Sequence, residues 1–146
     1  MKGEIRHIGL VFKDISEKVE HFKNIFGISE MNMLDVKTRK NIHNEKIEPI
    51  KERLAFATIG EMQIEIMQKL EGNAVYDDFL EKNPAGGIHH LGLYVEDIEE
   101  AIKDLEAKGI KQLFNGIVAG LKIAYFDTVD TLGYVLEVMQ VKVKKT

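Results

Sequence analysis

Alternating apolar and polar positions open each half of the chain. Residues Ile5–Phe12 and Ile88–Val95 have the period of two that is typical of a strand with one buried face. In each half the next apolar residues are spaced three and four apart, over Ile15–Phe26 and Ile98–Leu105, as in an amphipathic helix. The pattern therefore predicts a strand followed by a helix in both halves.

The predicted helix ends carry matching signals in the two halves. An Asp followed three residues later by a Glu is a capping-box pattern, and a Gly at the far end is typical of a helix C-terminus. The residues are Asp14 with Glu17 and Asp97 with Glu100 at the starts, and Gly27 and Gly109 at the ends.

Strand-like alternation returns after each helix. The expected strands are Glu30–Val36, Arg53–Ile59 and Met62–Lys69 in the first half, and Lys111–Phe114, Leu121–Phe126 and Tyr134–Val141 in the second. Turns are expected at Asn115–Gly120 and Asp127–Gly133, and a short helix over Val75–Lys82 between the halves. Each half thus has the order β-α-β-β-β.

The two halves are copies of one module. The segment that starts His7-Ile-Gly-Leu matches the one that starts His90-Leu-Gly-Leu, and Ile64-Glu-Ile-Met-Gln matches Leu136-Glu-Val-Met-Gln. We therefore expect one domain of residues 1–146 made of two βαβββ modules, about 4–70 and 88–141. One helix covers only one face of each small sheet, so the expected fold is α+β, with a curved mixed sheet around a central cavity.

Strand parity assigns side chains to the two faces of this sheet. The apolar neighbours on either side of Glu65 and Glu137 mark the helix-covered face, so both carboxylates face the cavity. By the same count His7 and His90 point inward and His89 points outward.

Two histidines and two carboxylates at equivalent places in two copies form a set of ligands for a metal ion. Two carboxylates buried close together repel each other, and a divalent cation removes that cost. Nitrogen and oxygen donors of this kind leave two positions free in an octahedral site. We therefore predict a divalent metal ion at His7, Glu65, His90 and Glu137.

Composition narrows the possible partners, metal ligands and cellular locations of the protein. The 146 residues hold 20 Lys and Arg against 24 Asp and Glu, a formal charge of −4, with no cluster of basic residues that would favour a nucleic-acid partner. The absence of Cys excludes disulfides and thiolate metal ligands. No apolar run has the length of a membrane span and no signal-peptide pattern is present, so a cytoplasmic protein is expected.

With these residues the chain resembles the vicinal oxygen chelate superfamily, which includes glyoxalase I, methylmalonyl-CoA epimerases, extradiol dioxygenases and bleomycin-resistance proteins. The segments Phe79–Ile98 and Ala101–Ile110 are most similar to the epimerases. The resemblance implies paired βαβββ modules with a His/(Glu or Gln)/His/Glu metal site, and it implies a homodimer. The turn Phe126–Gly133 departs from the His-Pro-Lys turn of the epimerases.

The resemblance and the ligand set together favour an isomerase or epimerase that uses Co, Mn, Ni or Zn and removes a proton α to a carbonyl. Glu137 and Glu65 are the candidate bases, and the expected substrate is a small molecule such as an acyl-CoA. A further epimerase Glu would fall at Glu48 or Glu52. Alternatives are a lactoylglutathione lyase (glyoxalase I)-like enzyme and a non-catalytic small-molecule-binding or resistance protein. The charged segment Asp35–Arg53 is either a solvated loop or a flap whose cations meet CoA phosphates.

Overall fold

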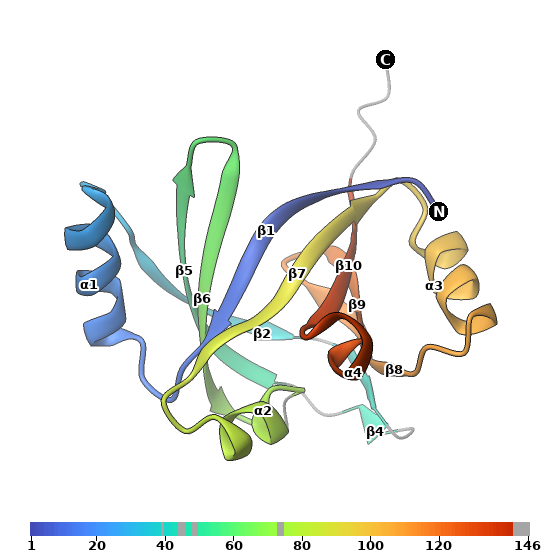
Figure 1. Cartoon of the computed structure of the whole chain (residues 1–146). Coiled ribbons are helices and arrows are strands. Elements are labelled where there is room, and N and C mark those ends of the chain that lie inside the picture. Colours follow the sequence, from blue (N-terminus) through green and yellow to red (C-terminus); the bar gives the residue numbers. More distant parts are fainter. Residues whose placement is uncertain (39, 44–45, 48–49, 73–74, 142–146) are drawn as a thin grey trace.

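The computed structural model (Figure 1) describes residues 1–37, 50–72 and 75–141 in full, and the backbone of 38, 40–43 and 46–47. The strands are β1 (Gly3–Val11), β2 (Met33–Thr38), β3 (Lys40–His43), β4 (Lys46–Ile47), β5 (Ile50–Ile59), β6 (Met62–Glu71), β7 (Gly87–Val95), β8 (Gln112–Val118), β9 (Leu121–Phe126) and β10 (Val135–Gln140). The helices are α1 (Ser16–Phe26), α2 (Asp77–Lys82), α3 (Ile98–Ala107) and α4 (Val129–Leu132).

All strands join in one sheet of order β2-β5-β6-β1-β7-β10-β9-β8-β3-β4. The first module contributes β2-β5-β6-β1 and the second β7-β10-β9-β8, and the modules meet where β1 pairs antiparallel with β7. Within the modules β1 runs parallel to β6, and β7 runs parallel to β10. The predicted α+β fold of two βαβββ modules in a curved mixed sheet is confirmed.

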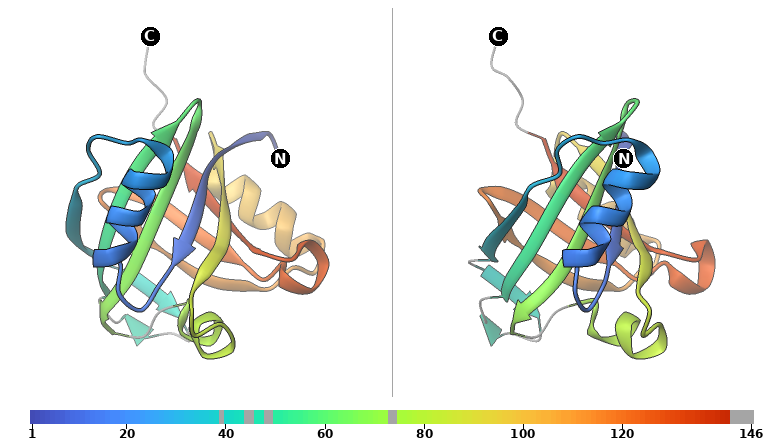
Figure 2. Two further views of the ribbon diagram at one scale, coloured as in Figure 1. Left: turned by 60° about the vertical axis from the view of Figure 1, so that its left-hand side comes forward. Right: turned by 90° about the vertical axis from the view of Figure 1, so that its left-hand side faces the viewer.

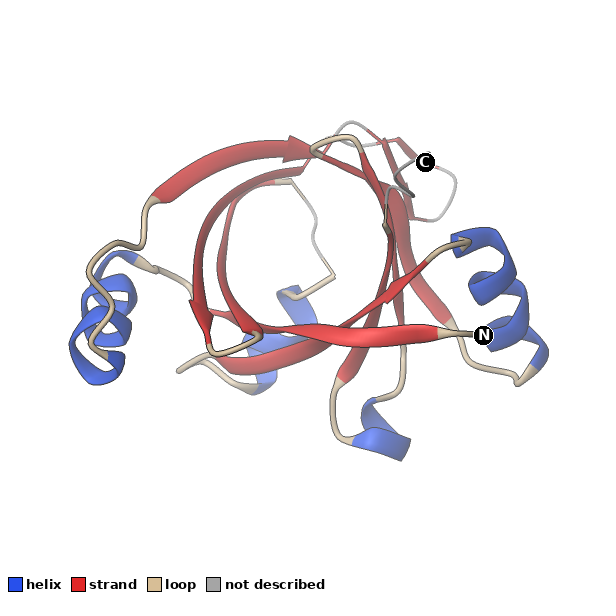
Figure 3. Ribbon diagram, turned by 90° about the horizontal axis from the view of Figure 1, so that it is seen from above, coloured by secondary structure: helices blue, strands red, loops and turns tan. Residues whose placement is uncertain are grey.

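The sheet curls so strongly that its ends approach each other. Seen from above, the strands form a ring with α1 and α3 outside it (Figure 3), and the side views show the same curl (Figure 2). Strand β3 follows β2 along the chain and pairs antiparallel with β8 of the other module. The segment predicted as a solvated loop or flap therefore supplies strands that link the two edges.

Helix α1 covers the outer face of the first module, and α3 covers that of the second. Ile15 and Val19 pack with Ile66 of β6, as the apolar stripe predicts. Ile102 and Leu105 pack in the same way with residues of β9 and β10. Because the outer faces are filled by helices, the alternate side chains of the strands are left for the inside of the ring.

The predicted caps are correct for one helix and wrong for the other. Asp97 caps α3 and accepts hydrogen bonds from the backbone N–H groups of Glu99 and Glu100. Helix α1 instead starts one residue later than the Asp14 cap allows, with Ile15 at the N-cap position and no side-chain cap. Asp14 accepts from the Ser16 N–H in the preceding turn.

Several strand boundaries also differ from the prediction. The turn expected at Asn115–Gly120 is only Ala119–Gly120, because β8 continues to Val118 and is held by β9 on one side and β3 on the other. Both turn residues have positive φ, 49° and 78°, as a tight two-residue hairpin requires. The first-half strands expected at 30–36 and 53–59 are instead β2 and β5, and the turn expected at 127–133 contains α4.

Candidate metal site

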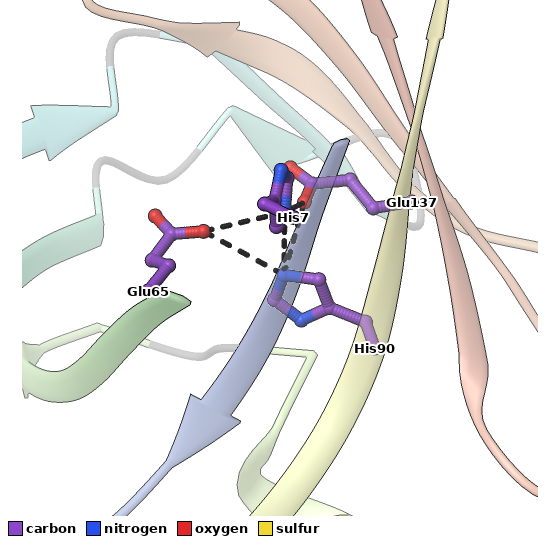
Figure 4. Close-up of side chains that lie close together, drawn as sticks. All are labelled: His7, Glu65, His90 and Glu137. Atoms are coloured by element: carbon purple, nitrogen blue, oxygen red, sulfur yellow. Dashed lines mark hydrogen bonds and ion pairs between the residues drawn. The ribbon is translucent and has the colours of Figure 1, made fainter. Parts of the chain in front are cut away.

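The four side chains grouped by strand parity meet at the centre of the sheet (Figure 4). They come from β1, β6, β7 and β10. The His7 and His90 Nε2 atoms lie 2.7 and 3.0 Å from Glu137 Oε2, and 3.2 Å from each other. Glu65 Oε2 lies 3.4 Å from His7 Nε2 and 3.7 Å from His90 Nε2. One ligand atom from each residue lies within 4.8 Å of all the others.

These separations fit one shared cation. Donors held about 2.1 Å from an octahedral ion lie about 3.0 Å apart when adjacent and about 4.2 Å apart when opposite. The separations between His and Glu atoms run from 2.7 to 3.7 Å, which is the range for donors around one ion. The two-nitrogen, two-oxygen set therefore suits a divalent metal.

The His-x-Gly pattern of each module is explained by the opposite module. In the β1–β7 register His7 faces Gly92, and Gly9 faces His90. A Cβ at Gly92 would lie 2.1 Å from the His7 ring, and one at Gly9 would lie 2.0 Å from the His90 ring. Each glycine thus leaves the space that the imidazole of the other copy occupies.

The second ring nitrogen of each histidine also has a partner. His7 Nδ1 lies 3.2 Å from the Tyr94 hydroxyl, and His90 Nδ1 lies 3.0 Å from His89 Nδ1. A hydrogen bond at Nδ1 fixes the orientation of the ring and directs Nε2 toward a metal ion. Both imidazoles are therefore held in orientation by a contact at Nδ1, while Nε2 faces the other members of the cluster.

The prediction that His89 points outward is wrong. His89 is buried, and its ring packs against Tyr76, Phe79 and Tyr125. The β1–β7 register shifts here, from Gly9 opposite His90 to Leu10 opposite Ile88. His89 is thus the extra residue of a β-bulge, and a bulge breaks the alternation on which parity depends.

The charges of the cluster are interdependent. Burial alone disfavours charge on His90, but Glu137 and then Glu65 outweigh it and raise the pKa of His90. Burial likewise raises the pKa of Glu137, and the two histidines overcome this effect and lower it. Burial, followed by the charge of His90, lowers the pKa of His89 to about 3, so His89 is neutral and one of its ring nitrogens can accept a hydrogen bond.

A cavity of about 410 Å³ lies beside the cluster and includes His7, Glu65 and Glu137 in its walls. Glu52 of β5 also lines it and is buried. Burial, followed by the charges of Glu65 and Glu137, raises the pKa of Glu52 to about 8. Of the two positions proposed for a further Glu, Glu52 therefore faces the site, while Glu48 lies outside the described residues.

Tyr125 and Tyr76 are among the cavity residues that were not predicted from the sequence. Tyr125 of β9 packs edge-on against His90, and Tyr76 lies just before α2. Parity along β9 places Tyr125 on the same face as Ile123, and this signal could have identified it. Tyr76 falls within the helix expected over Val75–Lys82, but α2 begins only at Asp77 and leaves Tyr76 at its N-cap position.

None of the described helices combines the length and apolarity that a membrane crossing requires.

The chain is similar to known proteins over most of its length. The Glyoxalase/Bleomycin resistance protein/Dioxygenase superfamily profile matches residues 6–126. The mitochondrial methylmalonyl-CoA epimerase of Dictyostelium discoideum is 28% identical over 109 residues, which cover 75% of this chain and 59% of that protein. The ethylmalonyl-CoA/methylmalonyl-CoA epimerase of Cereibacter sphaeroides is 29% identical over 116 residues, covering 80% and 78%. The chain spans less than two thirds of the length of the mitochondrial relatives, namely 59% and 61% of the length of two of them.

Solved structures share the fold. A methylmalonyl-CoA epimerase in complex with methylmalonyl-CoA and NH4+ superposes with a TM-score of 0.69 at 18% identity, covering 100% of this chain and 99% of that one. A hypothetical protein from Bacillus halodurans gives a TM-score of 0.67 at 22% identity, with the same coverage. At these identities the likeness concerns the fold.

Proposed function

Because the chain belongs to the Glyoxalase/Bleomycin resistance protein/Dioxygenase superfamily, we propose that it is a metal-dependent enzyme that removes and returns a proton on the carbon next to a carbonyl. The observation that carries this proposal is the convergence of two imidazoles and two carboxylates within 4.8 Å, at the wall of a cavity. In this proposal residues 4–70 and 88–141 act as the two modules of one domain, since each supplies one His and one Glu.

We assign the metal to His7, Glu65, His90 and Glu137, with Co, Mn, Ni and Zn as candidate ions. A divalent ion there supplies positive charge that stabilises the negative charge developing on substrate oxygen atoms during proton removal. Tyr94 and His89 hold the two imidazoles in place through Nδ1. Gly92 and Gly9 leave the space for the rings.

Three carboxyl groups can hold or move a proton at this site. Glu65 makes the longer contacts in the cluster, and Glu137 the shorter ones; both are candidate bases. Burial is the largest of the effects that raise the pKa of Glu52, so this carboxyl group can hold a proton and donate it. A base and a separate acid that both face one cavity permit epimerisation, because the proton can return from a different group.

The substrate class proposed is an acyl-CoA with an acidic α-proton, as the names of the epimerase relatives suggest. A glyoxalase I-like lyase is less well supported. Glutathione carries two carboxylates, and the described residues that line the cavity include no lysine or arginine to receive them. The predicted homodimer stays a prediction.

The test is exchange of the α-proton of methylmalonyl-CoA in D2O, followed by NMR. Chelator-treated protein should lose exchange activity and regain it with Co²⁺ or Mn²⁺. Glu137→Gln should be inactive with or without added metal, whereas His21→Ala, on the exposed side of α1, should be as active as wild type once metal is added. Full exchange activity in rigorously metal-free protein would contradict the proposal.

A further inference from the structure

The cavity beside the metal cluster is larger than the reacting end of a substrate needs. Its volume of about 410 Å³ falls within the range of small-molecule sites. The two carbonyl groups of a malonyl thioester and the α-carbon between them would occupy only the part next to His7, Glu65 and Glu137. The rest of the space is available to another part of the ligand.

The wall away from the cluster is almost entirely apolar. It is built by side chains from β2, β5 and the β8–β9 hairpin: Val36, Ile50, Leu54, Phe114, Val118 and Leu121. Ile50, Leu54 and Phe114 are between 2% and 5% exposed. A hydrocarbon group of a ligand placed against such a wall is removed from water, which raises the affinity of the ligand for the protein.

The described lining offers no cationic partner for an anionic group in this part of the cavity. The described lining residues include three carboxyl groups, Glu52, Glu65 and Glu137, and neither lysine nor arginine. A phosphate or carboxylate here would lose its hydration without gaining a cationic partner. The group that fits is therefore uncharged.

One polar group in the wall lacks a partner. The Tyr76 hydroxyl is buried and has no hydrogen-bond partner among the described residues, and Tyr76 lines the cavity. A buried hydroxyl in a protein usually has a partner. An oxygen atom on a bound ligand would provide one.

We propose that the substrate places an uncharged, largely hydrocarbon arm in this cavity, with Tyr76 donating a hydrogen bond to an oxygen atom of that arm. This inference rests on the proposed function, because the four donors fix the position of the reacting end. Two parts of an acyl thioester have this chemistry: the substituent on the α-carbon, and the carrier arm beyond the thioester sulfur.

Two ligand series distinguish these sources, with binding measured by isothermal titration calorimetry on Co²⁺-loaded protein. The first is methyl-, propyl- and hexylmalonate, and the second is methylmalonyl thioesters of methane-, butane- and hexanethiol. Each buried methylene should tighten binding about fourfold in the series whose arm enters the cavity. If affinity rises with chain length in the first series, the cavity holds the α-substituent. If it rises in the second series, the cavity holds the carrier arm. Affinity independent of chain length in both series would overturn the proposal.

Neighbouring residues of β9 provide matched variants. Leu121 lines the cavity, whereas Lys122 is exposed on the opposite face. Leu121→Trp should abolish the dependence on chain length, and Lys122→Trp should preserve it. Tyr76→Phe should weaken ligands whose arm carries a carbonyl oxygen by roughly threefold to tenfold, without affecting the alkyl series. Equal affinity of Tyr76→Phe and wild type for every ligand would remove Tyr76 from the site.

A Co²⁺ titration of the same preparation separates this inference from the proposed function. Absence of Co²⁺ uptake would contradict the proposed function itself. Normal uptake combined with length-independent binding would contradict only the assignment of the arm.

Discussion

Replacing Gly92 by Ala tests whether the glycines of the two His-x-Gly patterns create the metal site. The new Cβ would lie 2.1 Å from His7 Cε1, whereas an ordinary contact begins at 3.4 Å. The ring must therefore shift by roughly 1.3 Å, the difference between these two distances. His7 is 1% exposed and is held at both ring nitrogens, so it cannot move without losing a partner.

Metal–ligand distances tolerate only about 0.2 Å. A shift of that size should displace His7 from the ligand set. We expect Gly92→Ala to weaken Co²⁺ binding about 100-fold or more, because loss of an outer partner alone costs about 10- to 100-fold. Overpacking should also cost about 1–3 kcal/mol of folding free energy. Gly9→Ala, which would place a Cβ 2.0 Å from the His90 ring, should behave in the same way.

Calorimetric titration with Co²⁺ measures the affinity, and urea denaturation measures the stability. Gly27→Ala is the matched control. Gly27 has a φ of 66°, and apart from its chain neighbours no atom of the described residues lies within 4 Å of the position that a Cβ would take there, so Ala costs about 1–2 kcal/mol through backbone strain alone. It should lose stability but keep its metal affinity. A folded Gly92→Ala protein that binds Co²⁺ as tightly as wild type would show that the His7 ring does not need this space.

Three further predictions concern single side chains. His89→Phe should weaken Co²⁺ binding roughly 10- to 100-fold by removing the acceptor at His90 Nδ1, and His89→Asn, which retains an acceptor, should recover part of the loss; equal affinities would exclude this role. Glu52 keeps its proton up to a pH of about 8 in the folded protein, against an ordinary pKa of 4.5. As the pH rises from about 5 to 8, the free energy of unfolding of the metal-free wild type should therefore fall by about 1.4 kcal/mol per pH unit relative to that of Glu52→Gln. Urea stabilities of the two proteins that change in parallel with pH would contradict the raised pKa. Asp97→Ala should destabilise the protein by about 1 kcal/mol through loss of the α3 cap, with unchanged Co²⁺ affinity.

The convergence of the four side chains could be predicted because it follows from local periodicity and from the repeat. Strand parity needs only the spacing of apolar residues around Glu65 and Glu137, and the repeat relates His7 to His90. The same reasoning failed one residue away. His89 lies at a bulge that depends on how β7 pairs with β1, and its own neighbours in the sequence do not reveal it.

Long-range pairing also explains the other differences. Asn115 and Gly116 are ordinary turn formers, yet β9 and β3 hold them in a strand. Glu52 shares a face with Leu54 and Phe56, and parity counted back from the Gly60 turn would have placed it in the cavity. That count requires β5 to begin as early as Ile50. The three consecutive charged residues that follow Ile50 are not typical of a strand, so the sequence did not indicate this early start.

A single divalent ion held jointly by the two modules underlies everything proposed for this site. Titration of chelator-treated protein with Co²⁺, followed by its visible absorption, is the decisive experiment. We predict one Co²⁺ per chain for wild type and for His21→Ala, and loss of tight binding for both His7→Ala and His90→Ala, one variant from each module. Absence of uptake by the wild type, or tight uptake that survives either replacement, would contradict a shared ion.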